Sequence, residues 1–184
     1  FQAVAKTLLT VGRNRLKARL GFFAILHTWG QQLTVHHHIH CAVPGGGVKA
    51  DGAWVNTSKR TRYFAPTKVL AAVFRGILLK ALRSAYTKGK LTFNGDFEAL
   101  LADVASRKWV VYAKPPFGGA SAVLKYLSRY TRKVALSNSR LLGFDHGMVS
   151  FSFKDYAGGV VRKVARMQAV EFMRRFLQHV PPPG

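Results

Sequence analysis

The apolar residues of the chain follow a helical spacing in five stretches. The clearest comes after Pro66, where Leu70, Val73, Phe74 and Ile77 begin a series that recurs every three or four positions. That spacing places the apolar side chains on one face of an α-helix, so this helix is expected to pack on a core. The same spacing predicts a basic amphipathic helix over 4–20 that ends at Gly21, a shorter helix capped by Asn94, and helices over 121–135 and 169–179.

Short apolar or alternating stretches bounded by turn residues predict the strands. Residues 22–28 and 33–44 flank the polar turn Trp29-Gly30-Gln31-Gln32, which indicates an antiparallel hairpin closed by the three glycines at 45–47. Asp51-Gly52 and Asp145-His146-Gly147 are typical of tight turns, so two further hairpins are expected there. The second of these joins strands over 140–144 and 148–153. Two more strands are predicted over 109–113 and 160–167, and a Pro/Gly loop over 114–119.

The order of these elements is hairpin, helix, helix, strand, helix, hairpin, strand, helix. It predicts an α+β fold in which a largely antiparallel β-sheet is covered by flanking helices. A length of 184 residues and a hydrophobic content of 48% fit a single domain over 1–184. Because the chain begins without methionine and stops just after three prolines, we expect it to be a segment of a longer protein.

The charge of the chain is strongly one-sided. Lysine and arginine number 29 against 7 acidic residues, a formal charge of +22, and the cations are spread along the whole chain. Such a charge favours a polyanionic partner, either nucleic acid or anionic lipid. No apolar run reaches the roughly 18 to 20 residues that span a bilayer and no signal-peptide pattern occurs, so nucleic acid is preferred and no membrane partner is expected. The single cysteine, Cys41, excludes an internal disulfide and fits a cytoplasmic location.

Four histidines lie within the five positions from His36 to His40. On a strand, His36, His38 and His40 share one face and His37 takes the other. Imidazoles two positions apart have Cα atoms about 6.7 Å apart and can converge on one metal ion, whereas His36 and His40, roughly 13 Å apart, are near the limit of reach. The spacing therefore indicates a site with two histidines from this strand and a further ligand from elsewhere or from a bend. Half-buried strand histidines that bind no ion are the alternative.

Two tyrosines, Tyr126 and Tyr130, lie four positions apart on a predicted helix and are therefore neighbours on one face. Four cations flank them: Lys125, Arg129, Arg132 and Lys133. A packing stripe is one interpretation of such a pair. The other is chemical, because a phenol with an ordinary pKa near 10 becomes a nucleophile for phosphorus when a metal ion or a cation lies beside it.

Several motifs in this order resemble those of the two-tyrosine HUH transposases of rolling-circle bacterial insertion sequences. The resemblance covers nearly the whole chain. It rests on His27-Thr28-Trp29-Gly30-Gln31, His36-x-His38-Ile39-His40-Cys41 running into Val43-Pro44-Gly45-Gly46-Gly47, Phe74-Arg75-Gly76, Trp109 to Lys114 with Pro116-Phe117-Gly118-Gly119, and Tyr126-Leu127 with Arg129-Tyr130-Thr131 running into Ala135-Leu136-Ser137-Asn138.

The resemblance implies an HUH endonuclease-like fold and an enzyme that nicks single-stranded DNA and transfers the strand through a 5′-phosphotyrosine intermediate during rolling-circle transposition. Tyr126 and Tyr130 are the implied nucleophiles. His38 and His40 are the implied ligands of a divalent ion on the scissile phosphate. Mg²⁺ or Mn²⁺ is the implied ion, although imidazoles by themselves suit zinc better.

The third metal ligand is predicted to be His36, which shares the strand face, while His27 and Gln31 from the other arm of the hairpin stay open as alternatives. Phosphate contacts are expected from five cations: Lys114, Lys125, Arg129, Arg132 and Lys133. The implied location is the bacterial cytoplasm. Two other functions remain alternatives, a replication initiator or relaxase that nicks an origin, and a non-catalytic nucleic-acid-binding domain.

Overall fold

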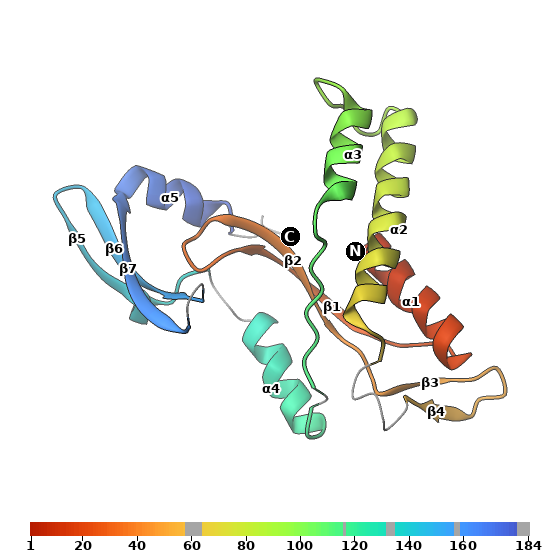
Figure 1. Cartoon of the computed structure of the whole chain (residues 1–184). Helices are drawn as coiled ribbons and strands as arrows, with labels where there is room; N and C mark the ends of the chain where they lie inside the picture. The colour runs from red at the N-terminus through yellow and green to blue at the C-terminus, as the bar shows by residue number, and fades with distance from the viewer. Residues whose placement is uncertain (58–63, 116, 132–134, 157–158, 180–184) are drawn as a thin grey trace. The chain divides into compact units, whose positions relative to one another are not determined.

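The computed structural model describes residues 1–57, 64–115, 117–131, 135–156 and 159–179, and the side chains of 129–131 are not included in that description. Its helices and antiparallel sheets confirm the predicted α+β class. Contacts divide the chain into two compact units, Phe1–Phe23 with Cys41–Gly118 and Ala24–His40 with Gly119–Gly184 (Figure 1). The single domain over 1–184 stays a prediction.

The first unit consists of three helices and a small hairpin. Its elements are α1 (Gln2–Leu16), β3 (Gly46–Val48), β4 (Trp54–Asn56), α2 (Thr67–Thr87) and α3 (Phe97–Ser106). Helix α1 packs on α2 and on β3, and its residues Leu8 and Val11 are buried. Helix α3 lies against α2, where the ring of Tyr86 stacks on Phe97 at a centroid distance of 4.0 Å. These contacts confirm that the helix after Pro66 packs on a core.

Helix α1 ends earlier than predicted, because Lys17 adopts a left-handed conformation with φ 51°. The three residues after it leave the helix so that Arg19 pairs with Val48 in an isolated antiparallel bridge. This pairing explains Gly47, because a Cβ there would lie 2.8 Å from the Arg19 carbonyl oxygen, whereas a Cβ on Gly46 would collide with the Val55 carbonyl oxygen and the Trp54 ring of β4. Gly46 and Gly47 therefore begin β3, and the prediction that they close the preceding strand was wrong.

Two other local predictions were also wrong. The cap of α3 is Asp96, whose side chain accepts a hydrogen bond from the Ala99 amide at 2.9 Å, and not Asn94. Residues 109–113 form no strand. Trp109 packs on Phe74, and its indole Nε1 donates to the carbonyl of Val104, so its side chain continues the packing of the helices.

The second unit carries the histidine hairpin. Strands β1 (Phe23–Trp29) and β2 (Val35–Ala42) pair in a two-stranded sheet, and the Gly30 amide donates to the Thr34 carbonyl in the turn between them. The remaining elements are α4 (Ala120–Thr131), the 3₁₀ turn η1 (Asn138–Arg140), β5 (Leu141–Asp145), β6 (Met148–Asp155), β7 (Val161–Gln168) and α5 (Ala169–Leu177).

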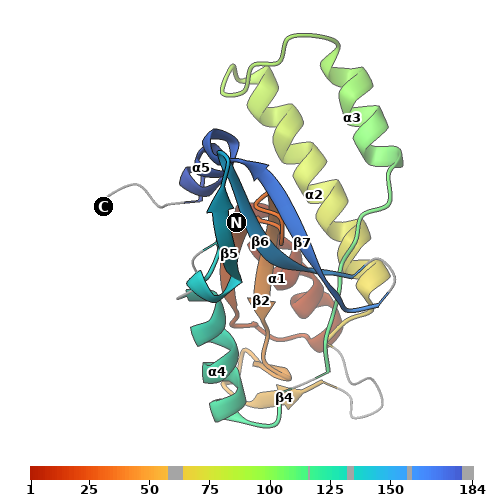
Figure 2. The ribbon, with the colours of Figure 1, turned by 90° about the vertical axis from the view of Figure 1, so that its left-hand side faces the viewer.

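Strands β5, β6 and β7 form an antiparallel sheet in that order (Figure 2). The turn after Asp145 is the predicted one. His146 and Gly147 both have positive φ, 48° and 74°, which suits the twist of a two-residue hairpin.

The core of the second unit lies on one face of this sheet. Phe151 and Leu33 are both 0% exposed, and Phe172 and Phe176 of α5 pack against the same cluster. Leu33 comes from the turn between β1 and β2, so the end of the histidine hairpin is fixed to the sheet. Among the described residues, no helix has the length and apolar character needed to cross a membrane.

Candidate metal and nucleophile site

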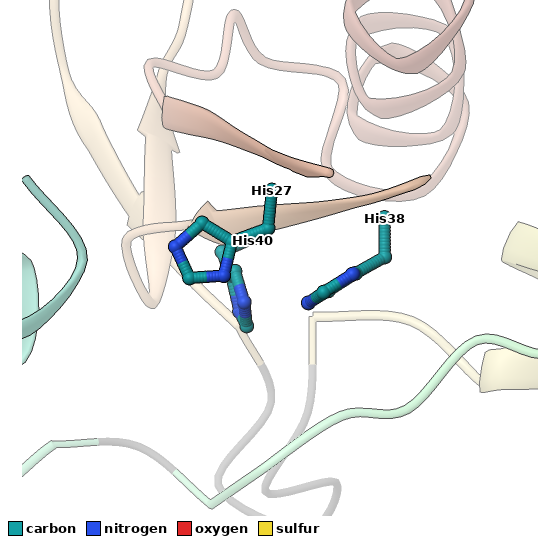
Figure 3. A group of neighbouring side chains, drawn as sticks. All are labelled: His27, His38 and His40. Atoms are coloured by element: carbon teal, nitrogen blue, oxygen red, sulfur yellow. The ribbon is translucent and has the colours of Figure 1, made fainter. Parts of the chain in front are cut away.

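Three imidazoles converge on the histidine hairpin (Figure 3). His27 comes from β1, and His38 and His40 come from β2. Each offers one nitrogen, and these three nitrogens lie within 4.8 Å of one another. His27 is buried and the other two are half-buried. The alternation of a strand places His38 and His40 on one face, and pairing with β1 brings His27 beside them.

Hydrogen bonds orient two of these rings. Nδ1 of His38 lies 2.9 Å from the carbonyl oxygen of His36, and Nδ1 of His40 lies 3.2 Å from the hydroxyl of Tyr126. A carbonyl oxygen accepts only, so Nδ1 of His38 donates this hydrogen bond, and in a neutral ring Nε2 then has the lone pair. A histidine that binds a metal through Nε2 is commonly held in this way through its other nitrogen.

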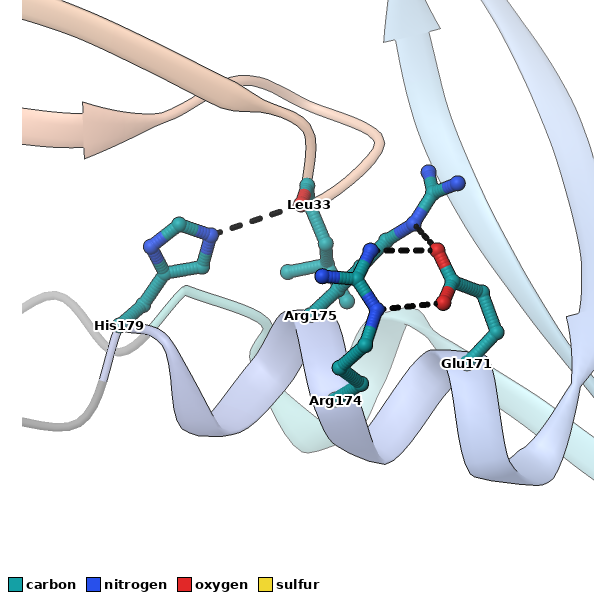
Figure 4. A network of polar contacts seen from close by, with 5 residues as sticks. All are labelled: Leu33, Glu171, Arg174, Arg175 and His179. Carbon is teal, nitrogen blue, oxygen red and sulfur yellow. Dashed lines mark hydrogen bonds and ion pairs between the residues drawn. The ribbon is translucent and has the colours of Figure 1, made fainter.

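The ring of His27 is held by packing. It stacks on the indole of Trp29, with ring centroids 4.7 Å apart and planes 24° apart. Trp29 in turn touches His179, whose Nδ1 lies 3.2 Å from the hydroxyl of Thr28 and whose Nε2 lies 3.4 Å from the Leu33 carbonyl oxygen (Figure 4). His179, just past the end of α5, therefore supports the arm of the hairpin that carries His27.

A cluster of charged side chains lies on helix α5. Glu171 accepts hydrogen bonds from Arg174 and Arg175 at 2.6 to 2.8 Å (Figure 4). These two guanidinium groups lower the pKa of Glu171 from its ordinary 4.5 to about 2. The pairs are i, i+3 and i, i+4 contacts on the helix, so they stabilise α5 locally.

Tyr126 reaches the histidines from α4. Its half-buried hydroxyl meets His40, 86 residues away in sequence, and both residues belong to the second unit. The backbone of Tyr130 lies one turn further along the same helix, and its side chain is outside the described residues. Which tyrosine is a nucleophile stays a prediction.

The other predicted site residues fall in different places. His36 lies next to His38, with ring centroids 4.9 Å apart, but it is exposed and does not belong to the convergent group. The side-chain oxygen of Gln31 accepts from the Lys154 amide, so it points toward β6. His27 is the third member of the convergent group of imidazoles. The strand pattern of 36–40 alone does not reveal this. The metal-binding roles of His36, His38 and His40 stay predictions.

The cations predicted to contact DNA are only partly described. Lys125 is exposed on α4 next to Tyr126, whereas Lys114 is exposed in the first unit. The side chain of Arg129 and all of Arg132 and Lys133 lie outside the described residues. Their contacts with phosphate stay predictions.

Comparison with known proteins places the chain among the transposases. Residues 21–184 match the family described as "Putative transposase", and the chain belongs to that family. This confirms the resemblance drawn from the motifs.

Two relatives are similar over almost the whole chain. A protein named "Putative transposase y4qJ" from Sinorhizobium fredii is 45% identical over 196 aligned residues, which cover 100% of this chain and 49% of the relative. The "Transposase for insertion sequence element IS801" from Pseudomonas savastanoi pv. phaseolicola is 26% identical over 186 residues, covering 98% of this chain and 44% of the relative. The chain thus spans about half the length of these curated relatives. No solved structure matches it.

Proposed function

We propose that this chain is the catalytic region of a transposase that nicks single-stranded DNA and joins the strand to a new site, as in rolling-circle transposition. In this proposal His27, His38 and His40 form a metal site and Tyr126 is the nucleophile. The observation that carries the proposal is the 3.2 Å contact between the Tyr126 hydroxyl and Nδ1 of His40, because it joins a candidate nucleophile to a candidate ligand.

The donor set fits a divalent cation. Three nitrogens within 4.8 Å of one another are near enough for small side-chain movements to bring them onto one ion, and Nε2 of His38 is the nitrogen left with a lone pair in the neutral ring. Imidazole binds zinc, copper, iron and nickel well, whereas Mg²⁺ and Mn²⁺ prefer oxygen. Mg²⁺ or Mn²⁺ follows from the resemblance, with DNA phosphate oxygens supplying the ligands that such ions prefer. A bound cation would polarise a phosphate oxygen of the DNA.

His40 has a second task in this proposal. A neutral imidazole whose Nε2 faces the cation carries its proton on Nδ1, which is the nitrogen nearest Tyr126. Nδ1 then donates a hydrogen bond to the phenol oxygen and stabilises negative charge on it as the phenolic proton leaves. His40 thereby holds the attacking oxygen next to the phosphate to be cleaved.

The reaction is a phosphoryl transfer without loss of bond energy. The phenol of Tyr126 gives up its proton to solvent as its oxygen bonds to phosphorus, the bond from phosphorus to the 3′ oxygen breaks, and that oxygen takes a proton from solvent to leave as a 3′ hydroxyl. The 5′ phosphate stays on the tyrosine. Attack by another 3′ hydroxyl reverses the step and joins the strand, so no nucleotide cofactor is required. Tyr130 would serve a second exchange, and Lys114, Lys125, Arg129, Arg132 and Lys133 would hold phosphates.

The polarity of the linkage gives a direct test. The chain is incubated with Mn²⁺ and single-stranded oligonucleotides that cover the DNA flanking its gene, labelled at either end, and the products are separated under denaturing conditions. A 3′ label should stay on the protein and a 5′ label should leave it. The substitution Tyr126→Phe should reduce the adduct at least 100-fold, whereas Tyr156→Phe, a control at a tyrosine 63% exposed, should not. Binding of DNA without any adduct would favour a non-catalytic module.

A further inference from the structure

The β5–β6–β7 sheet has one face on the core and one face that points away from it. The register of β6 and β7 assigns their residues: Phe151 pairs with Ala165 on the core side, whereas Lys154 pairs with Arg162 on the other side. Arg166, opposite Ser150, shares that outer face because it follows Arg162 by four positions. In Figure 2 the three strands lie in front of α5, so this outer face is turned toward the viewer.

Three cations lie on this face: Arg162 and Arg166 along β7, and Lys154 beside Arg162 on β6. We call these three residues the basic strip. All three are exposed, and Val164 between the two arginines is 62% exposed. Within the described part of the chain, none of the three makes an ion pair. By contrast, Lys163 points to the core side of the strand and pairs with Asp155 at 2.7 Å.

The acidic residues of the protein are all engaged elsewhere. Four of the seven accept from a cationic side chain, in the pairs Glu98–Arg83, Asp103–Arg107, Asp155–Lys163 and Glu171 with Arg174 and Arg175. Asp145 lies against His146, and Asp51 and Asp96 accept from backbone amides. Among the described residues, no carboxylate therefore neutralises the basic strip.

The strip is unfavourable in the protein alone. Lys154 and Arg162 stand directly opposite each other on neighbouring strands, and like charges in that position destabilise a sheet. With 29 cations in the chain many have no acidic partner, but the sheet holds these three at fixed positions on one face. Arg162 and Arg166 are about 13 Å apart along the strand. A flexible polyanion that follows the strand would remove the repulsion.

We propose that the basic strip binds the backbone of single-stranded DNA, on a part of the strand away from the point of cleavage. The proposal rests on the proposed function and adds a second contact region on the same unit of the protein. The two arginines and Lys154 contact phosphates, and Val164 covers apolar sugar surface between them. Positive grooves that track the backbone are a common way to hold single strands without reading their sequence.

The test compares two triple variants of equal charge. Lys154→Gln with Arg162→Gln and Arg166→Gln removes the strip, and Lys68→Gln with Lys80→Gln and Lys88→Gln removes three exposed lysines on and after α2. Binding of a fluorescent 30-nucleotide single strand is measured from low to physiological salt. The strip variant should bind at least 10-fold more weakly at low salt, and the slope of log affinity against log salt should fall by about 2. The control variant should change the slope by less than 1.

Adduct formation and stability separate this proposal from the proposed function. At saturating DNA the strip variant should form the tyrosine adduct at the wild-type rate, because the strip lies outside the histidine site. The melting temperature of the strip variant should be no lower than that of the wild type, because the substitutions remove the repulsion between Lys154 and Arg162. Wild-type affinity and salt slope in the strip variant would overturn the proposal, as would a loss of binding to anionic lipid vesicles with DNA binding unchanged. A wild-type chain that forms no adduct but shows the predicted fall in slope would overturn only the catalytic proposal.

Discussion

The hydroxyl of Tyr126 lies 3.2 Å from Nδ1 of His40 although 86 residues separate them. This contact joins the helix of the paired tyrosines to the histidine strand. It predicts that substitutions of Tyr126 and of His40 have different effects on metal affinity. Tyr126→Phe should abolish the DNA adduct and leave metal affinity within about twofold. His40→Ala should lose the adduct and also lower metal affinity by 10-fold or more, since it removes a ligand. Calorimetric titration with Mn²⁺ alongside the adduct assay measures both.

Two outcomes would contradict the roles of His40 as a metal ligand and of Tyr126 as the nucleophile. If His40→Ala binds the cation as tightly as the wild type, then His40 acts only on the tyrosine. If Tyr126→Phe keeps the adduct and Tyr130→Phe loses it, the two tyrosines exchange roles.

The identity of the third ligand gives a second prediction. His27, from the neighbouring strand, belongs to the convergent group, whereas the exposed His36 offers its backbone carbonyl to His38. We expect His27→Ala to lower metal affinity 10-fold to 100-fold and His36→Ala to lower it less than threefold. Both variants remove one imidazole, so each controls for the other. The reverse order of affinities would make His36 the ligand and His27 a packing residue.

The contrast between these histidines shows what the sequence can predict. Alternation along one strand places His38 and His40 on a shared face, and that inference needs only local geometry. His27 joins them through the register of β1 against β2, which depends on pairing between separate strands. The resemblance left His27 and Gln31 as alternatives to His36, and the shared strand face favoured His36. Only the pairing in space makes that distinction.

The same division holds for the fold. The helix of 67–87 was predictable, because its apolar spacing is long and regular. The strand predicted over 109–113 failed because a short apolar run does not reveal whether a partner strand exists, and Trp109 packs on Phe74 instead. The end of α1 at Lys17 also escaped prediction, since a lysine with φ 51° there depends on the bridge between Arg19 and Val48. Local patterns predict the elements, and tertiary pairing decides their ends.

Trp29 supports His27 without being a candidate ligand itself. Its indole stacks on the His27 ring at 4.7 Å, and the rings of Trp29 and His179 are 5.4 Å apart. Trp29→Leu should lower metal affinity about 10-fold, because the imidazole loses the surface that fixes its orientation. At saturating cation the rate of adduct formation should return to within a few-fold of the wild type, and Trp29→Phe should restore much of the affinity. A fall in rate that excess cation does not correct would show a direct role in DNA binding.

Glu171 predicts a dependence of stability on pH. Arg174 and Arg175 lower the pKa of Glu171 from its ordinary 4.5 to about 2. The contribution of Glu171 to stability is therefore fully present above pH 4.5 and is lost as the pH falls from 4.5 through about 2. Glu171→Gln should lower the melting temperature slightly at pH 6, and the difference from the wild type should vanish near pH 2. Because these groups are at the surface, the difference should also shrink in 1 M salt. A constant difference across this range would assign the effect to packing.

Leu33 fixes the histidine hairpin to the sheet. Its side chain is 0% exposed in the cluster around Phe151, although its backbone has the unfavourable φ of 58°. Burial of the side chain must outweigh the cost of about 1–2 kcal/mol for a left-handed conformation. Leu33→Ala keeps that cost and loses the contacts, so it should lower the free energy of unfolding by about 2–5 kcal/mol. Leu26→Ala, at a residue 41% exposed on β1, should lower it by less than about 1 kcal/mol. Chemical denaturation monitored by circular dichroism measures both, and equal effects would show that the turn does not anchor the hairpin.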